Sequence, residues 1–185
     1  MIPTRSEAFE ILKKYTKNEA LLRHALAVEG CMRHFAALYG EDAELWGVCG
    51  LLHDIDYELY PSEHCKKAPE LLRAENVDET IIRAVVSHGY AIAVDVEPLS
   101  SMEKTLYAID ELTGLITACA IMRPSKSVSD LELKSVKKKY KVLNFAAGVD
   151  RAVIERGAEM LCKDIDFLIG ECILGMRACA EAIGL

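Results

Sequence analysis

The chain has 185 residues, of which 51% are hydrophobic and 6% aromatic. This length and apolar content suit one globular domain with a sizeable core and exclude a disordered protein. The formal net charge of −7 argues against a nucleic-acid-binding protein. Seven scattered cysteines without a CxxC pair fit a reducing compartment. No stretch resembles a signal peptide or a membrane span, so we expect a soluble, cytoplasmic protein without membrane partners.

The first segments of the chain have the pattern of amphipathic helices with defined ends. Thr4–Glu7 has the form of a capping box and predicts a first helix that reaches about Lys14. Asn18 is a suitable N-cap for a long second helix that extends to Tyr39. Gly40 favours the end of that helix. Two helices are therefore predicted before residue 41.

The middle of the chain is expected to contain shorter helices. Asp42 is a suitable N-cap for a third helix, which ends near an adjacent histidine and aspartate. Pro61 and Pro69 break the next stretch into short helical pieces. Asn76–Glu79 has the form of another capping box, and the helix that it opens stops at His88.

The remaining segments are also mostly helical in pattern. Ser100 predicts the start of a long helix that ends at Arg123, before a proline. Residues 125–141 are polar and basic, and residues 149–183 form a last helical segment. Ala91–Val96 is the only weak candidate for a strand. Within the last segment three glycines favour interruptions: Gly157, Gly170 and Gly175.

Two histidines and two aspartates occupy inward positions on three of these helices. His53 and Asp54 end the apolar segment WGVCGLLHDID, and His24 and Asp110 lie among apolar residues on their own helices. A lone inward histidine is more often a hydrogen-bonded core residue than a ligand. Two buried carboxylates beside neutral imidazoles are costly without a counter-charge. The four residues together therefore predict a bound cation.

The order of these four residues is similar to that of a known family. His24 in RHALAVEG, His53 and Asp54 in LLHDID, and Asp110 in AIDELTGLI resemble the motifs of the HD-domain metal-dependent phosphohydrolases. The resemblance covers about residues 20–123. It implies an all-α fold, an HD-domain helical bundle, with residues 125–185 as a C-terminal helical extension of a single domain over 1–185.

The resemblance also implies one or two divalent metal ions. In two-metal members further histidines complete the site, and His64 in HCKKAPELL and His88 match those positions. Many such members carry His-His at the later position, whereas this chain has His88 followed by Gly89, which leaves the second site one ligand poorer. Nitrogen and oxygen ligands suit Mn, Fe, Co, Ni, Zn or Mg and do not identify the metal.

The family's chemistry implies hydrolysis of a small phosphorylated substrate, a phosphomonoester or phosphodiester such as a nucleotide. Asp54 would bridge two ions, and Asp56 is our candidate for proton transfer, because many members carry an acidic residue soon after the His-Asp pair. A run of lysines is usually a solvated face. Lysines near the site or in the basic run 134–141 are nevertheless candidates for substrate binding: Lys66, Lys67, Lys137 and Lys139.

Two other functions fit the same residues. Some relatives of the fold hold a di-iron centre and cleave carbon bonds with oxygen, and the six ligand candidates here have the corresponding order. A non-catalytic HD module that binds a nucleotide is the third hypothesis, although all four core ligand positions are filled. The sequence leaves the oligomeric state open.

Overall fold

The computed structural model describes residues 1–185 and confirms the all-α class. It contains ten α-helices and one short 3-10 turn, and it has no β-strand. The helices are α1 Arg5–Tyr15, α2 Glu19–Tyr39, α3 Ala43–Leu52, α4 Ala68–Ala74, α5 Glu79–Ser87, α6 Ser101–Ile121, α7 Leu133–Tyr140, α8 Arg151–Met160, α9 Ile165–Ala178 and α10 Ala180–Ile183, with the 3-10 turn η1 at Pro61–Glu63.

The predicted caps account for where the first helices begin and end. The Thr4 and Glu7 side chains form the expected capping box of α1. The Asn18 side chain accepts a hydrogen bond from the backbone N–H of Ala20 and so caps α2. Gly40 ends α2 in the left-handed conformation, with a φ of 72° that glycine adopts without steric cost. Local sequence thus fixes the limits of the helix that supplies His24.

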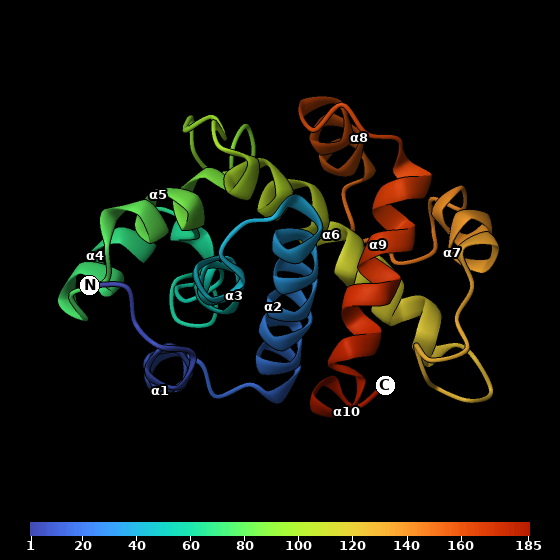
Figure 1. Ribbon diagram of the computed structural model, residues 1–185, viewed down its shortest axis with the longest axis horizontal. Coiled ribbons are helices and arrows are strands. Elements are labelled where there is room, and N and C mark those ends of the chain that lie inside the picture. The colour runs from blue at the N-terminus through green and yellow to red at the C-terminus, as the bar shows by residue number, and fades with distance from the viewer.

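Helix α2 stands at the centre of the molecule, between α3 on one side and α9 on the other (Figure 1). Its most extensive packing is against α3. The long helix α6 passes behind α2 and α9 and also packs against α8 (Figure 1). Because α2, α3 and α6 contact one another, residues far apart in sequence meet between them. No helix combines the length and the apolar composition needed to cross a membrane.

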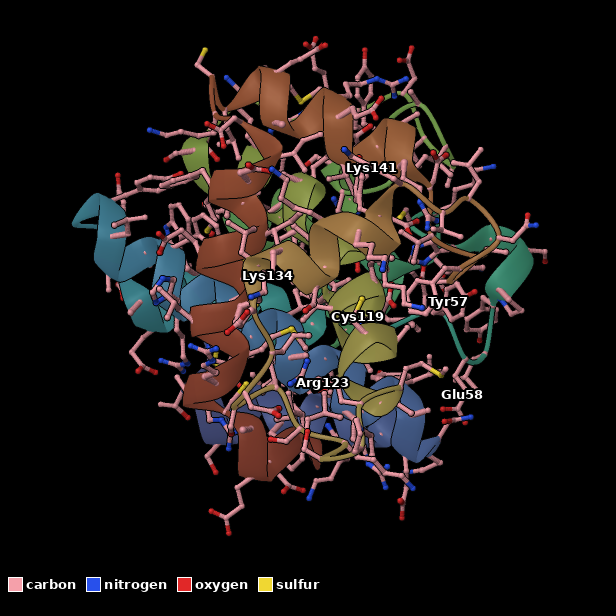
Figure 2. All side chains as sticks on the ribbon, turned by 90° about the vertical axis from the view of Figure 1, so that its right-hand side faces the viewer. Tyr57, Glu58, Cys119, Arg123, Lys134 and Lys141 are labelled. Carbon is pink, nitrogen blue, oxygen red and sulfur yellow. The ribbon has the colours of Figure 1, made fainter.

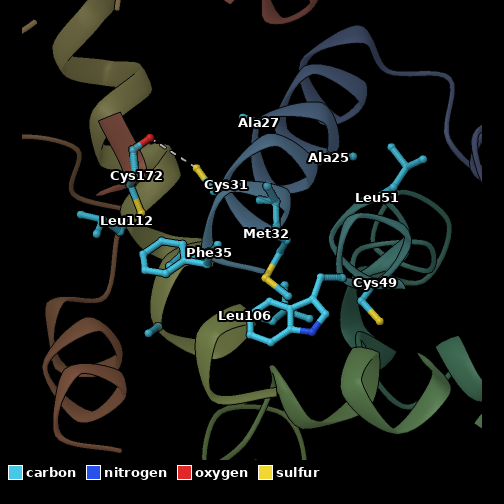
Figure 3. Close-up of a cluster of buried hydrophobic side chains, with 14 of the residues drawn as sticks. Ala25, Ala27, Cys31, Met32, Phe35, Cys49, Leu51, Leu106, Leu112 and Cys172 are labelled. Carbon is cyan, nitrogen blue, oxygen red and sulfur yellow. Dashed lines mark hydrogen bonds between the residues drawn. The ribbon is translucent and has the colours of Figure 1, made fainter. Parts of the chain in front are cut away.

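One connected cluster of 43 buried hydrophobic residues holds these helices together. Met32 and Phe35 of α2 lie in it beside Leu106 of α6 (Figure 3). The Cys31 thiol donates to the carbonyl oxygen of Cys172 on α9, at 3.5 Å (Figure 3). The cysteines are free thiols, most of them buried, where they pack as small apolar side chains.

The C-terminal part differs from the expectation in detail. The basic stretch 125–141 contains a helix, α7, whose Val136 is buried. The last segment is interrupted, as expected, but not at its glycines: it divides into α8, α9 and α10. The first break follows Leu161, where Cys162 has a φ of 53° and Asp164 caps α9 through the Phe167 N–H. A new N-cap, rather than weak glycine propensity, therefore sets this boundary.

The weak strand candidate at Ala91–Val96 is wrong. These residues form turns after α5, with one isolated bridge between Tyr90 and Val94. No neighbouring strand is available to pair with this segment, so its alternating pattern cannot form a sheet.

Candidate metal centre

Two of the predicted ligands lie at the carboxyl ends of short helices. His53 follows α3, and its Nδ1 donates to the carbonyl oxygen of Gly50 at 2.7 Å. His88 follows α5, and its Nδ1 donates in the same way to the carbonyl oxygen of Val85. In both residues the proton is thereby assigned to Nδ1, which leaves the Nε2 lone pair free. The negative ends of the two helix dipoles also favour a cation here.

The first half of the site joins His53 to residues of α2 and α6. The Nε2 atoms of His24 and His53 lie 3.2 Å apart. Oδ1 of Asp110 lies 2.9 Å from His24 Nε2 and 3.3 Å from His53 Nε2. The side chains of His24 and Asp110 are 25% and 21% exposed, so this half of the site opens to solvent while His53 is fully buried.

The second half joins His64, which follows η1, to His88. Their Nε2 atoms are also 3.2 Å apart. His64 Nδ1 donates to Oδ1 of Asp56 at 2.9 Å, and Oδ2 of Asp56 accepts the backbone N–H of Ala68 at 2.8 Å. Asp56 is fully buried and both of its oxygens are engaged. It therefore orients His64.

Asp54 connects the two halves because its carboxylate oxygens face opposite histidine pairs. Oδ2 lies 3.4 Å from His53 Nε2 and 3.7 Å from His24 Nε2. Oδ1 lies 3.5 Å from His64 Nε2 and 3.6 Å from His88 Nε2. A carboxylate in this position could serve as a ligand shared between the two histidine pairs. The structure thus brings together all six residues that the sequence singled out as metal ligands.

The charges within the cluster need compensation. Burial opposes protonation of His53, but the carboxylates of Asp54 and Asp110 outweigh it and raise the pKa of His53 to about 10. Burial disfavours the charged form of both aspartates, yet the histidines hold the pKa of Asp54 and of Asp110 below the usual value. The carboxylates therefore stay charged and favour a positive charge beside them, which protonated imidazoles or a metal ion can supply.

The donor set fits divalent metal ions. Imidazole nitrogens and carboxylate oxygens are ligands for first-row metals. Two nitrogens bound to one ion at about 2.0–2.1 Å lie roughly 3 Å apart, close to the 3.2 Å within each histidine pair. Three overlapping groups of side chains each have their donor atoms within 4.8 Å of one another: His24, His53 and Asp110; His53, Asp54 and His88; and His64, Cys65 and His88. His24, His53, Asp54 and Asp110 could hold one ion, and Asp54, His64 and His88 a second.

A pocket of about 360 Å³ opens over both halves of the site. Its wall includes residues that the sequence did not single out: Leu21, Tyr57, Ile92, Glu111 and Val153. Burial and the neighbouring Asp110 raise the pKa of Glu111 to about 7. The position of Glu111 directly after Asp110 could have identified it as a site residue from the sequence. Nothing in the sequence places Val153 near the motifs.

Two substrate-binding candidates close to His64 lie outside this pocket. The ammonium group of Lys67 pairs with Glu70 at 2.9 Å and lies over the Tyr60 ring. Lys66 is exposed, and neither lysine lines the pocket. Neither side chain therefore extends into the pocket, and substrate binding by Lys66 and Lys67 stays a prediction that the structure does not support.

The two candidates on α7 do not line the pocket either. Lys137 pairs with Asp166 of α9, and Lys139 lies over the Phe145 ring with 4.8 Å from Nζ to the ring centroid. Figure 2 shows Lys134 and Lys141 near the two ends of α7, on the side of the C-terminal helices, whereas Tyr57 lies on the turn after α3. The following turn does reach the pocket, but through Gly148.

The prediction that Asp56 transfers protons is likewise not supported. Its carboxylate is buried behind His64 and does not line the pocket. Glu111 is the one acidic side chain of the pocket wall besides Asp54 and Asp110. It is half-buried and accepts the backbone N–H of Asp150 at 3.2 Å.

The glycine after His88 has a structural reason. A Cβ atom at Gly89 would lie 2.5 Å from the Sγ atom of Cys65. The thiol therefore occupies the space into which a side chain at position 89 would project. Cys65 itself has a φ of 62°, and its Sγ lies 3.8 Å from His88 Nε2. Burial raises the pKa of this thiol, but the adjacent His88 and His64 outweigh burial and lower it to about 7.

Comparison with known families gives one match. The family described as HD domain matches residues 21–115, which is about half of the chain and includes all six residues of the cluster. Gly148 and Val153, on the far wall of the pocket, lie beyond the matched region. No solved structure gives a significant match to the chain.

Proposed function

Since the chain belongs to the HD-domain family, we propose that it is a metal-dependent phosphohydrolase that cleaves a phosphomonoester or phosphodiester. The observation that carries this proposal is the division of the Asp54 carboxylate between the pairs His24–His53 and His64–His88. A carboxylate placed in this way suits two divalent ions that share one phosphoryl group.

The residues of the site have distinct roles in this proposal. His24, His53, Asp54 and Asp110 would hold the first ion, and Asp54, His64 and His88 would hold the second. When bound, such ions polarise a phosphoryl oxygen and lower the pKa of water, so that hydrolysis proceeds near neutral pH. The Gly50 and Val85 carbonyls and Asp56 keep three imidazoles oriented with Nε2 toward the ions.

Glu111 is our candidate for proton transfer in place of Asp56. It lies on the pocket wall beside Asp110, where a leaving-group oxygen or a water molecule could reach its carboxylate. The backbone N–H of Asp150 donates to its Oε2 atom, and Oε1 accepts no hydrogen bond from another residue.

Metal analysis followed by an assay tests the proposal. The protein is stripped with a chelator, reconstituted with Mn²⁺, Fe²⁺, Co²⁺, Ni²⁺, Zn²⁺ or Mg²⁺, and assayed with phenyl phosphate and bis(p-nitrophenyl) phosphate. We expect metal-dependent release of phosphate or phenol that Asp54→Ala abolishes. His34→Gln is the matched control, because His34 pairs with Glu171 at 2.6 Å outside the site. Absence of both bound metal and hydrolysis would refute the function.

A di-iron oxygenase remains the second candidate, and one observation favours it. The pocket wall contains no lysine or arginine that would contact a phosphate group. Oxygen consumption by the Fe²⁺-loaded protein, measured with an oxygen electrode alongside the phosphatase assay, separates the two reactions. Oxygen uptake without phosphate release would assign the oxygenase function.

A further inference from the structure

The charge on the wall of the catalytic pocket limits which phosphate esters it can accept. Fourteen residues line the pocket, and none is a lysine or arginine. The charged side chains are Asp54, Asp110 and Glu111, together with the histidines of the cluster. Apart from the histidines of the cluster and any bound ions, the wall therefore offers no positive charge for phosphoryl groups other than the reacting one.

The two arginines that flank Val153 in the sequence are engaged elsewhere. The Arg151 guanidinium donates to backbone carbonyl oxygens of the turn after α7, among them Ala146 at 3.0 Å and Val149 at 2.9 Å. It therefore fixes the turn that supplies Gly148 and does not point into the pocket. Arg156 donates to the Tyr107 hydroxyl at 3.0 Å. Neither guanidinium is available to a ligand without breaking these hydrogen bonds.

The rest of the wall is apolar or aromatic. Leu21, Ala93 and Val153 face the cavity, and Tyr57 and Ile92 lie at its mouth with 43% and 59% of their surfaces exposed. The Tyr57 ring lies edge-on to His64, with 5.1 Å between the ring centroids. A volume of about 360 Å³ is near the lower end for small-molecule sites. A compact apolar group beside the metal centre would bury this surface.

We propose that the substrate carries a single phosphoryl group joined to an apolar aryl or alkyl leaving group, and that nucleoside di- and triphosphates are poor substrates. This inference rests on the proposed phosphohydrolase function. In the reaction, water adds its oxygen to phosphorus, the ester P–O bond breaks, and the leaving oxygen takes a proton, which yields phosphate and an alcohol or phenol. Enzymes that act on polyphosphate chains use Lys, Arg and backbone N–H groups to hold the further charges.

A neighbouring pocket provides the competing possibility. It shares His24 and Gly114 with the catalytic pocket and carries Arg23 and Lys126. Arg23 already pairs with Glu19 at 2.8 Å, which leaves Lys126 as its unpaired cation. A polyphosphate that extended past His24 into this pocket would depend on Lys126 for charge neutralisation. The variant Lys126→Ala tests this possibility.

The experiment compares kcat/KM for phenyl phosphate, AMP, ADP and ATP at one fixed metal concentration. We expect phenyl phosphate to exceed ATP by about tenfold or more, the effect of one missing charged partner. In calorimetry, the non-hydrolysable phenylphosphonate should bind more tightly than imidodiphosphate. Ile92→Lys, which adds a cation at the mouth, should raise the ATP-to-phenyl-phosphate ratio about tenfold. Leu99→Lys adds the same charge at an exposed position outside the pocket and should leave the ratio unchanged.

The outcomes are distinguishable. ATP cleavage equal to or faster than phenyl phosphate cleavage would overturn the inference and leave the hydrolase function intact. If Lys126→Ala then removed the ATP activity, the neighbouring pocket would be the polyphosphate site. Failure to hydrolyse any ester with any metal would overturn the proposed function, and the substrate class with it.

Discussion

The Asp56 carboxylate is hydrogen-bonded to His64, with 2.9 Å between Oδ1 and Nδ1, and lies on the side of the imidazole away from the metal cluster. Its other oxygen accepts the Ala68 N–H at the start of α4. Asp56 thus links the orientation of one candidate ligand to the position of a helix. A carboxylate in this place keeps the His64 proton on Nδ1 and the lone pair on Nε2.

We expect Asp56→Asn to weaken binding of the second ion by about 10–100-fold. The single amide oxygen would accept the Ala68 N–H, so the amide nitrogen would donate to His64 Nδ1. That exchange moves the imidazole proton to Nε2, the atom that faces the cluster. Calorimetric titration with Mn²⁺ or Zn²⁺ measures the loss. Asp95→Asn, at an exposed position, is the control, and unchanged two-ion binding in D56N would show that His64 is not a ligand.

Asp54 and Asp110 should differ in how many ions they control. Asp110 contacts only the His24–His53 pair, whereas Asp54 faces both pairs. We expect D110N to retain about one ion per chain on the His64–His88 side, and D54N to retain less. Elemental analysis after gel filtration measures the stoichiometry. Equal metal content in the two variants would contradict a bridging role for Asp54.

Loss of the metal should also lower stability. An ion that binds only the folded chain stabilises it by about 2.7 kcal/mol when present at 100 times its dissociation constant. We expect the melting temperature of the wild type to rise on addition of the preferred metal and that of D54N to change little. Differential scanning calorimetry in chelator and in metal measures both. A rise of equal size in D54N would place the stabilising ion elsewhere.

Gly157 of α8 packs directly against Ala108 of α6. A Cβ atom at Gly157 would lie 2.5 Å from both Cα and Cβ of Ala108. We expect Gly157→Ala to push α8 away from α6 and to lower the free energy of unfolding by about 1–3 kcal/mol. Because α8 carries Val153, the pocket wall should shift as well and KM should rise.

Gly170 is the matched control for this substitution. It lies inside α9, and a Cβ there would meet no atom within 4 Å. Gly170→Ala should therefore stabilise the protein by about 0.5–1 kcal/mol, since alanine has the higher helix propensity. Urea denaturation of both variants measures the contrast. Similar effects of the two substitutions would refute close packing between α8 and α6.

Cys65 and Gly89 should be energetically coupled. Gly89→Ala places a methyl group 2.5 Å from the Cys65 sulfur and should displace the turn that holds His64. Cys65→Ala removes that sulfur, so the double variant should recover part of the stability that Gly89→Ala loses. We expect a coupling energy of about 0.5–3 kcal/mol from a double-mutant cycle in urea. Simple additivity would show that the thiol does not fill the space beside residue 89.

Helix limits could be predicted where a single side chain determines them. Thr4, Asn18 and Asp42 cap their helices through hydrogen bonds to residues two or three positions later, and such local geometry is visible in sequence. The break at Cys162 was not predicted, because the pattern of glycines suggested other positions. The cap that restarts the helix, Asp164, is an ordinary polar residue in an otherwise helical pattern.

The six clustered residues could be located because their order along the chain resembles a known pattern. The lysines could not be assigned, because charge density along the sequence does not reveal which carboxylate neutralises each ammonium group. Lys137 is paired with Asp166, 29 positions away. The role of Asp56 depends on its distance from Ala68 and His64, which is set by the turn around η1. Val153 reaches the pocket through packing of α8 on α6, a contact without a local signal.

The far wall of the pocket comes from Gly148 and Val153, beyond the residues that the family match covers. The six clustered residues and this part of the pocket wall thus come from separate stretches of the chain. Evolution can exchange the second stretch while the first is preserved. Under the proposed function, a change in the second stretch would alter the shape of the pocket and leave the six candidate ligands in place, so the ligand pattern alone does not identify the substrate.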